Sequence, residues 1–184
     1  MKIGLSQRVL YHKGRAYDSI EHGWYSYLRE HTLVFIPNRP DQDFEKLANS
    51  IDALILTGGD DSAVRRTTEL KIATEIIKQR KPLLGVCHGC FLLTEQLDGV
   101  IGTIDGHVDT LHEVNYFGER KIVNSFHNLY INTPYDKATI LATDSDGHCE
   151  AWIDCKLAIA GVVWHPERMQ VPWIPEEINQ LIGL

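Results

Sequence analysis

Short apolar runs alternate with longer amphipathic segments over the first half of the chain. The apolar runs predict strands at residues 2–6, 32–37, 53–57 and 82–87. The amphipathic segments predict helices at residues 20–30, 42–50 and 65–80. In the last of these helices, four apolar side chains share one face (Leu70, Ala73, Ile76 and Ile77). The charged side chains are expected on the other faces. Such alternation predicts an α/β fold in which helices cover both faces of a mainly parallel sheet.

After about residue 98 the pattern changes to short β-rich pieces among glycine and asparagine turns. These pieces predict strands at residues 108–114, 121–123, 139–143, 150–153 and 157–163. A closing helix is expected over residues 175–184, because a proline and two glutamates suit a first helical turn. Since no linker, repeat or low-complexity tract divides the chain, we expect a single domain over residues 1–184.

The overall composition argues against several classes of function. The 184 residues include 18 basic and 25 acidic side chains, and the resulting net charge of −7 argues against sequence-independent nucleic-acid binding. No run approaches the ~18 apolar residues of a membrane helix, and the N-terminus lacks the apolar stretch of a secretory signal. The cysteines are interpreted as free thiols (Cys87, Cys90, Cys149 and Cys155). We therefore expect a cytoplasmic protein without a membrane or nucleic-acid partner.

Cys87 lies where the fourth predicted strand turns into a further predicted helix over residues 88–97. Gly85 and Gly89 flank it and leave room for a sharp turn, as in the nucleophile elbow of serine hydrolases. The N-terminus of a helix also favours a thiolate. Two alternatives are a buried core cysteine, since cysteine is among the most buried residue types, and a redox pair with Cys90.

His165 differs from the other histidines because it follows a buried apolar run, residues 158–164, and precedes a carboxylate. In an extended segment residues i and i+2 project to the same side, so Glu167 is expected to hydrogen-bond the His165 imidazole. A histidine that merely ends a strand is the alternative. A thiol, an imidazole and a carboxylate form a catalytic triad by their roles, so the sequence predicts a cysteine hydrolase acting on an amide.

The third predicted strand ends in a pair of glycines, Gly58 and Gly59. The backbone N–H of Gly59, together with that of His88, is expected to form an oxyanion hole, with a plain loop as the alternative. The cysteines and histidines do not have the spacing of a zinc site, and covalent cysteine catalysis needs no metal. We therefore expect no metal and no organic cofactor.

Three motifs together resemble the class I glutamine amidotransferase superfamily in order and spacing: residues 57–60 (T-G-G-D), 85–89 (G-V-C-H-G) and 165–167 (H-P-E). The resemblance implies a flavodoxin-like three-layer α/β/α sandwich that cleaves γ-glutamyl amides through a γ-glutamyl thioester. It also implies a nucleophile, a general base and acid, and a residue that orients the base (Cys87, His165 and Glu167). The small-molecule partner would be a γ-glutamyl substrate.

Residues 123–128 (V-N-S-F-H-N) resemble the V-N-S-x-H stretch of the γ-glutamyl hydrolase branch, with a core strand as the alternative. This resemblance implies a set of residues at the glutamyl group (Gly58, Ser125, Phe126 and His127). Residues 66–69 (R-T-T-E) resemble the R-D-x-x-E of that branch more weakly, since Thr67 replaces the aspartate.

Phe91 marks a departure from the pattern of the superfamily. Glutamine-using members commonly carry a glutamine at this position, and phenylalanine cannot hydrogen-bond. With no synthase domain in the chain, this favours a hydrolase that releases glutamate from a γ-glutamyl conjugate. The elbow is most similar to that of γ-glutamyl-CDP-amidate hydrolases, which give cytidine diphosphoramidate for capsule modification. Candidate diphosphate contacts, or else residues of a solvated basic loop, are Arg8, Lys13 and Arg15.

Two other functions stay open. A glutaminase subunit would pass ammonia to a separate synthase or ligase partner, and it would expose an apolar docking patch. A non-catalytic or thiol-sensing relative would need a reactive thiol but no general acid, so the pairing of His165 with Glu167 argues against it.

Overall fold

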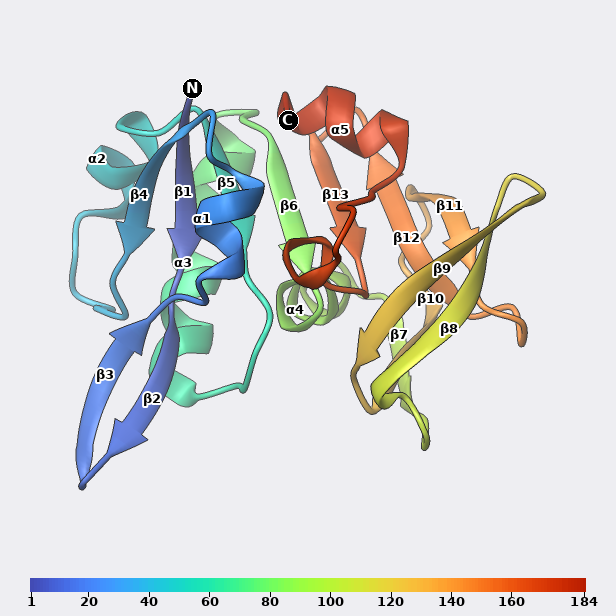
Figure 1. Ribbon diagram of the computed structural model, residues 1–184. Coiled ribbons are helices and arrows are strands. Elements are labelled where there is room, and N and C mark those ends of the chain that lie inside the picture. The colour runs from blue at the N-terminus through green and yellow to red at the C-terminus, as the bar shows by residue number, and fades with distance from the viewer.

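The computed structural model describes residues 1–184 and has a mixed sheet at its centre (Figure 1). Its parallel part runs in the order β4 (Thr32–Ile36), β1 (Lys2–Ser6), β5 (Ala53–Leu56), β6 (Leu83–Val86) and β13 (Ile159–Val162). Antiparallel strands continue it as β12 (Cys149–Asp154), β11 (Thr139–Thr143), β8 (Val108–Tyr116) and β9 (Glu119–Phe126). β10 (Leu129–Thr133) pairs with β12 and with β7 (Val100–Thr103). The predicted α/β class is confirmed. Parallel pairing is confined to the five neighbouring strands β4, β1, β5, β6 and β13.

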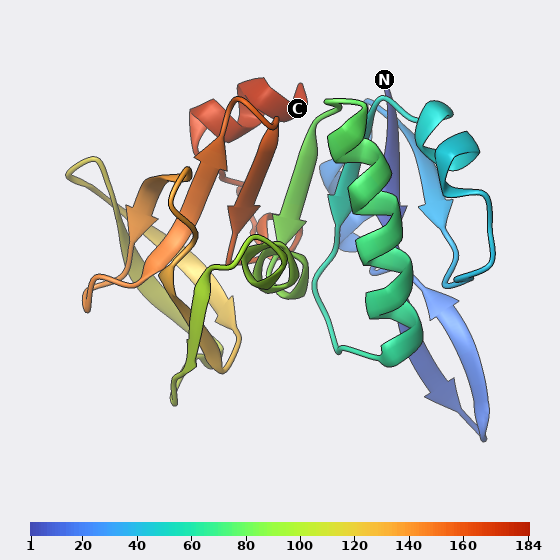
Figure 2. The same cartoon turned by 180° about the vertical axis from the view of Figure 1, so that it is seen from behind.

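Helices cover both faces of the parallel part. One face carries α2 (Phe44–Asn49), α3 (Ala63–Lys78) and α4 (His88–Gln96), of which α3 and α4 lie in front of the sheet in Figure 2. The other face carries α1 (Gly23–Tyr27), the 3₁₀ turn η1 (Pro166–Arg168) and α5 (Glu176–Ile182). The two faces bury separate apolar clusters of 21 and 19 residues, so the flavodoxin-like three-layer arrangement follows from burial on both sides.

Four strands were not predicted from the sequence. The hairpin of β2 (Arg8–His12) and β3 (Arg15–Ser19) projects away from the sheet, and its two strands pair only with each other (Figure 1). β7 and β10 are likewise short and partly exposed. Their apolar runs are at most three residues long and most of their residues are not buried, so the hydrophobic pattern carries only a weak signal for them. The helix predicted over residues 20–30 is also shorter, because only Gly23–Tyr27 is helical.

The prediction that the charges of α3 avoid its buried face is wrong. Arg65 and Glu69 are fully buried on that face, whereas Leu70 and Ile77 are only half-buried. The two charged side chains are four residues apart, and Arg65 Nε lies 2.9 Å from Glu69 Oε1. A buried charge is tolerated when it is paired and hydrogen-bonded, which periodicity alone does not reveal.

The parallel strands bring three distant segments together at one edge of the sheet. β6 lies between β5 and β13, with Leu56 beside Gly85 and Val162 beside Val86. The residues that follow these strands therefore meet where active sites of open α/β sheets lie, beyond the carboxyl ends. None of the helices combines the length and the apolar character that crossing a membrane requires.

Candidate active site

Cys87 occupies a strained turn between β6 and α4. Its backbone has φ 49° and ψ −106°, outside the regions that ordinary residues favour, and its side chain is 7% exposed. A Cβ atom on Gly85 would lie 2.5 Å from the carbonyl oxygen of Gly89, and one on Gly89 would contact the backbone of Leu56. The glycines therefore let α4 begin directly against β5 and β6, and the thiol lies at the N-terminus of this helix.

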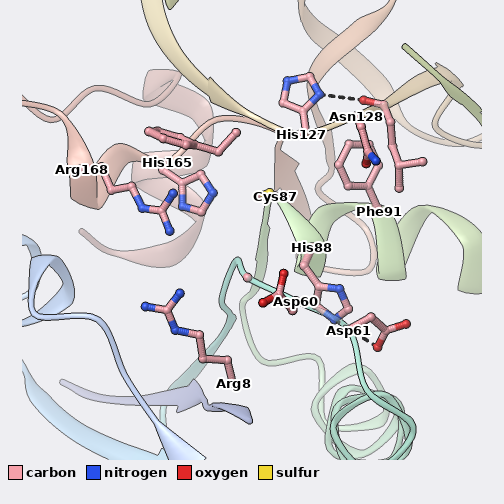
Figure 3. A pocket seen from close by; sticks show the side chains of 13 residues that line it. Arg8, Asp60, Asp61, Cys87, His88, Phe91, His127, Asn128, His165 and Arg168 are labelled. Carbon is pink, nitrogen blue, oxygen red and sulfur yellow. Dashed lines mark hydrogen bonds and ion pairs between the residues drawn. The ribbon is translucent and has the colours of Figure 1, made fainter. Parts of the chain in front are cut away.

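His165 connects the thiol to a carboxylate. Its ring and the Cys87 thiol line the same pocket (Figure 3). On the far side of the ring, its Nδ1 lies 2.7 Å from Glu167 Oε1. The side chains of His165 and Glu167 are only 2% and 1% exposed. The expected extended segment is wrong in detail, because only His165 is extended and Glu167 lies in the 3₁₀ turn η1. The predicted contact forms nonetheless, since Pro166 begins the turn and brings the carboxylate back to the ring.

The surroundings of His165 favour its protonated form. Burial alone would lower its pKa, but the hydrogen bonds and charges of Cys87 and Glu167 raise the pKa to about 9. At neutral pH the imidazole therefore holds a proton between the sulfur and the carboxylate. A base held this way can deliver its proton to a leaving group.

Asn124 fixes the backbone that carries His165. Its Oδ1 accepts from the His165 N–H at 2.8 Å, and its Nδ2 donates to the His165 carbonyl at 2.8 Å. Asn124 lies on β9, so the antiparallel part of the sheet holds a residue of the parallel part. The position of Asn124 inside the V-N-S-x-H segment indicated a residue near the site. The sequence did not reveal that Asn124 contacts His165.

The glycine loop after β5 lies beneath the imidazole. A Cβ atom on Gly58 would collide with His165 Cε1, so a side chain here would displace the ring. Gly59 has φ 114°, which favours glycine, and it faces the pocket. Arg65 braces this loop from α3, because it donates to the carbonyls of Thr57 and Asp60 at 2.5 and 3.0 Å.

His88 begins α4 and is held by Glu69. Its Nε2 lies 2.9 Å from Glu69 Oε2. Burial would raise the pKa of Glu69, but the hydrogen bond to His88 and the charge of Arg65 lower it, so the carboxylate is ionised. The basic partner of Glu69 on the same helix is Arg65, while Arg66 pairs with Glu95 at 2.6 Å.

A pocket of about 400 Å³ opens over the thiol (Figure 3). Six of the nine predicted catalytic, oxyanion and substrate-binding residues line it (Gly59, Cys87, His88, Phe126, His127 and His165). Further lining residues include two acidic residues, Phe91 and two arginines (Asp60, Asp61, Phe91, Arg8 and Arg168). Three other named residues do not line it (Gly58, Ser125 and Glu167). Glu167 and Gly58 lie behind the imidazole instead.

Ser125 lies behind the pocket wall. Its hydroxyl is fully buried and donates to the His107 carbonyl at 2.6 Å. The same carbonyl accepts from the His127 N–H at 3.0 Å. Ser125 therefore ties together the segments before β8 and after β9, and its side chain does not reach into the pocket.

Two arginines share one carboxylate at the rim of the pocket. Arg168 Nε and Glu21 Oε1 are 2.9 Å apart, and an Arg8 nitrogen lies 3.3 Å from Glu21 Oε2. The Arg168 guanidinium also lies 4.6 Å from the centre of the Phe126 ring. Of the three basic residues singled out from the sequence, only Arg8 lines the pocket, since Lys13 and Arg15 are exposed at the hairpin turn. Arg168 was missed, although it directly follows H-P-E.

Cys90 does not share the surroundings of Cys87. It is fully buried on the opposite face of the sheet, against Gly161 and Trp152, and burial raises its pKa well above the usual range. All four cysteines are free thiols. A thiol this inaccessible and this weakly acidic is a poor partner for exchange, which argues against the redox pair.

Comparison with known proteins identifies the family. The family Glutamine amidotransferase class-I matches residues 15–181. The γ-glutamyl-CDP-amidate hydrolase of Campylobacter jejuni is 28% identical over 91% of this chain and 90% of its own. One subunit of the glutamine-hydrolysing GMP synthase of Saccharolobus solfataricus is 27% identical over 91% of this chain and 89% of its own.

A solved structure has the same fold. A glutamine amidotransferase from Thermotoga maritima superimposes with a TM-score of 0.71 at 15% identity, covering 98% of this chain and 79% of its own. The match to the family extends over most of the chain, from the hairpin to α5. The chain is therefore an amidohydrolase that belongs to the class I glutamine amidotransferases.

Proposed function

We propose that the chain hydrolyses a γ-glutamyl amide through a thioester on Cys87. The observation that carries this proposal is that Cys87 and His165 line the same pocket while Glu167, behind the imidazole, lies 2.7 Å from His165 Nδ1. The Cys87 thiolate attacks the γ-carbonyl carbon and forms a C–S bond. His165 gives its proton to the leaving amine as the C–N bond breaks.

Water completes the cycle. His165, now neutral, accepts a proton from a water molecule as its oxygen attacks the thioester carbon. The C–S bond breaks, glutamate leaves, and Cys87 is again a thiolate beside a protonated imidazole. Glu167 keeps Nδ1 protonated throughout, so that Nε2 is the nitrogen that exchanges protons.

The tetrahedral intermediates would be stabilised at the loop after β5 and at the start of α4. The N–H groups of Gly59 and His88 are the proposed oxyanion donors, and the N-terminus of α4 adds a favourable dipole. Arg65 supports this role because it holds the carbonyls of the glycine loop, which leaves the loop N–H groups free to face the pocket.

The pocket offers opposite charges for the two ends of an amino acid. Asp60 and Asp61 suit the α-ammonium group of a glutamyl moiety, and Arg8 and Arg168 suit its α-carboxylate or an anionic leaving group. Phe126 and His127 would form the wall beside it. We assign no substrate contact to Gly58 or to the Ser125 side chain, because neither residue lines the pocket and the Ser125 hydroxyl donates to the His107 carbonyl.

We propose a γ-glutamyl conjugate as the substrate. Phe91 lines the pocket. Family members that use free glutamine as substrate commonly have a Gln residue at this position, and Phe91 cannot make the hydrogen bond that such a residue offers. The similarity to the C. jejuni enzyme and the two arginines at the rim support γ-glutamyl-CDP-amidate, whose diphosphate is anionic.

A glutaminase subunit is the second candidate. An apolar hollow of about 540 Å³ lies on the surface between β8, β9 and the segment after η1. Three large side chains at its edge are exposed (Leu111, Ile122 and Val171). A patch of this kind suits a synthase partner, and the S. solfataricus relative is by name one part of a synthase.

The two candidates are separated by glutamate release from the purified chain. Rapid release from γ-glutamyl-CDP-amidate with slow release from L-glutamine would establish the conjugate hydrolase. Rapid release from glutamine alone would support the glutaminase. The Cys87→Ala variant is the blank, and Phe91→Gln tests the pocket wall, since it should raise kcat/KM for glutamine by about 2–10-fold if one hydrogen bond is restored. No release from either substrate would contradict both candidates.

A further inference from the structure

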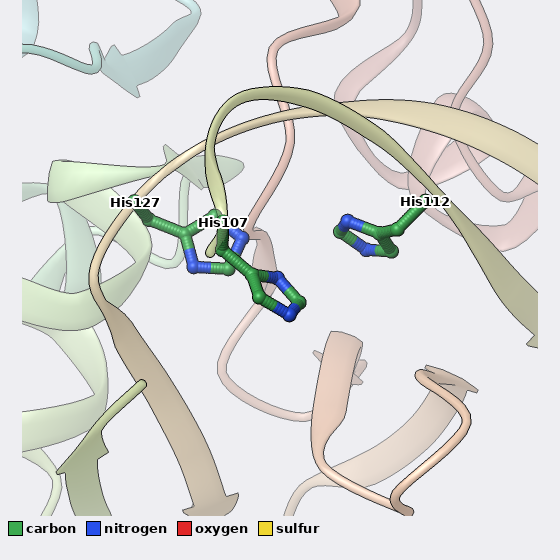
Figure 4. Close-up of side chains that lie close together, drawn as sticks. All are labelled: His107, His112 and His127. Carbon is green, nitrogen blue, oxygen red and sulfur yellow. The ribbon is translucent and has the colours of Figure 1, made fainter. Parts of the chain in front are cut away.

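Three histidines converge behind the pocket wall (Figure 4). His107 precedes β8, His112 lies on β8 and His127 follows β9. One nitrogen from each ring lies within 4.8 Å of the other two. The rings face one another at centroid distances of 5.0, 5.2 and 6.1 Å, and Phe91 packs against His127. We call these three residues the histidine cluster.

Four of the six ring nitrogens of the histidine cluster are buried without a hydrogen-bond partner in the protein. These buried atoms are Nδ1 of His107, both ring nitrogens of His112 and Nε2 of His127. Glu150 on β12 adds a carboxylate that is 2% exposed, and its Oε2 is also unpartnered. A buried polar group without a hydrogen bond costs about 1–3 kcal/mol. Of these five atoms, His112 Nε2 and Glu150 Oε2 lie 3.2 Å from each other, and the remaining three histidine nitrogens indicate a missing ligand.

His127 is held in the form that binds metals. Its Nδ1 lies 2.7 Å from the Leu129 carbonyl, which can only accept, so Nδ1 carries the proton and Nε2 presents its lone pair to the cluster. A hydrogen bond from the other ring nitrogen to a carbonyl is the usual support of a ligating histidine.

We propose that the histidine cluster and Glu150 form a Zn²⁺ site. Three imidazoles and one carboxylate match the ligand preference of zinc and complete a tetrahedral, closed site. Two ligands about 2.1 Å from a tetrahedral ion are about 3.4 Å apart. His112 Nε2 and Glu150 Oε2 are already 3.2 Å apart, although they are not aligned for a hydrogen bond. The ligand nitrogens of the three imidazoles, which lie within 4.8 Å of one another, would reach this spacing by rotation of their side chains.

The proposed ion would cross-link the antiparallel part of the sheet. It would join the segment before β8, β8 itself, the segment after β9 and β12. Because His127 also lines the pocket, zinc would fix the position of one pocket wall. The site is thus distinct from the thiol, and its expected role is to hold structure, as in closed zinc sites generally.

A second group of possible ligands is a poorer candidate. Asp144, Asp146 and His148 also lie within 4.8 Å of one another. However, Asp144 Oδ1 accepts from two backbone N–H groups and its Oδ2 lies 2.8 Å from His148 Nδ1. This group closes its own turn and is partly exposed, so it serves as the matched control.

The test is zinc binding by the untagged, full-length chain. Zinc per chain is measured by elemental analysis after dialysis, and affinity by titration calorimetry. Both are carried out with Cys87→Ala, so that the reactive thiol cannot supply a ligand. We expect one zinc per chain and a higher Tm in its presence. His112→Gln should weaken binding ~100-fold, and His148→Gln should leave it unchanged.

Cobalt gives an independent readout of the ligands. Co²⁺ in the proposed site should have the intense visible absorption of a tetrahedral complex without thiolate charge-transfer bands. If His112→Gln does not fold, His107→Gln replaces it, since His107 lies in a loop. The proposal is overturned if the chain binds no zinc, if binding survives both cluster variants, or if His148→Gln abolishes it.

Discussion

Two buried histidines stand beside the same pocket in opposite surroundings. His165 lies at the parallel edge of the sheet, where its ring faces Cys87 in the pocket and bonds Glu167, and where Asn124 bonds its backbone. His127 lies at the antiparallel side, where only the Leu129 carbonyl bonds to its ring. The pKa of the first is raised to about 9, and the pKa of the second is lowered by burial.

This difference explains which chemistry each ring can perform. A ring that faces a sulfur and bonds a carboxylate is arranged to hold and transfer a proton. A ring that stays neutral, with one nitrogen unpartnered, is arranged to donate a lone pair to a cation. Burial acts on both rings in the same direction, so the partners decide the outcome.

Removal of the Cys87 thiol should have the largest effect, and it should change the pKa of His165 but not that of His127. Cys87→Ala should lower kcat by about 10⁴–10⁶-fold, as for loss of a catalytic nucleophile. It should also lower the pKa of His165, because a major cause of the raised value is lost, and leave His127 unchanged. Glutamate release and NMR titration of the ring protons measure the two effects. Cys155→Ala, at an exposed thiol, is the control and should retain full activity.

Glu167→Gln should have the next largest effect. It keeps the size of the side chain but replaces the carboxylate on His165 Nδ1 with an amide. We expect kcat to fall by about 10²–10⁴-fold, because the tautomer and charge of the ring change while the nucleophile stays. Steady-state rates at several pH values check this. An unchanged rate would mean that Glu167 does not orient the base.

Variants of the buried Arg65–Glu69 ion pair on α3 test whether the glycine loop and His88 depend on paired charges for their support. Arg65→Met leaves Glu69 buried with only His88 as its partner, and should reduce the free energy of unfolding by about 3–5 kcal/mol. Arg66→Met, one residue along the same helix, removes an exposed ion pair and should cost about 0–1 kcal/mol. Urea denaturation compares the two. Equal losses would contradict the role given to Arg65.

The sequence reveals what lies close together along the chain. The elbow at Cys87 and the H-P-E segment at His165 are local, and apolar runs mark the central strands, so the fold class could be predicted. Contacts that depend on distant partners could not. Asn124 and His165 are 41 residues apart, and Arg168 and Glu21 are 147 apart. The histidine cluster and Glu150 come from β8, from β12 and from the segments that precede β8 and follow β9. No local pattern specifies the register of these strands.

The smallest predicted effects concern the free energy of unfolding as a function of pH. The contributions of His165 and His127 should change with pH in opposite directions. His165 has a pKa of about 9 in the folded chain against 6.5 when unperturbed, which corresponds to about 3 kcal/mol. This stabilisation is fully present below pH 6.5 and is lost as the pH rises through 9. His127 has a lowered pKa, so its contribution is present above pH 6.5 and is lost as the pH falls. Urea denaturation between pH 5 and 10 measures both limbs, and His165→Gln should flatten only the alkaline one. If both histidines titrated near 6.5 by NMR, the contrast between the two regions would be wrong.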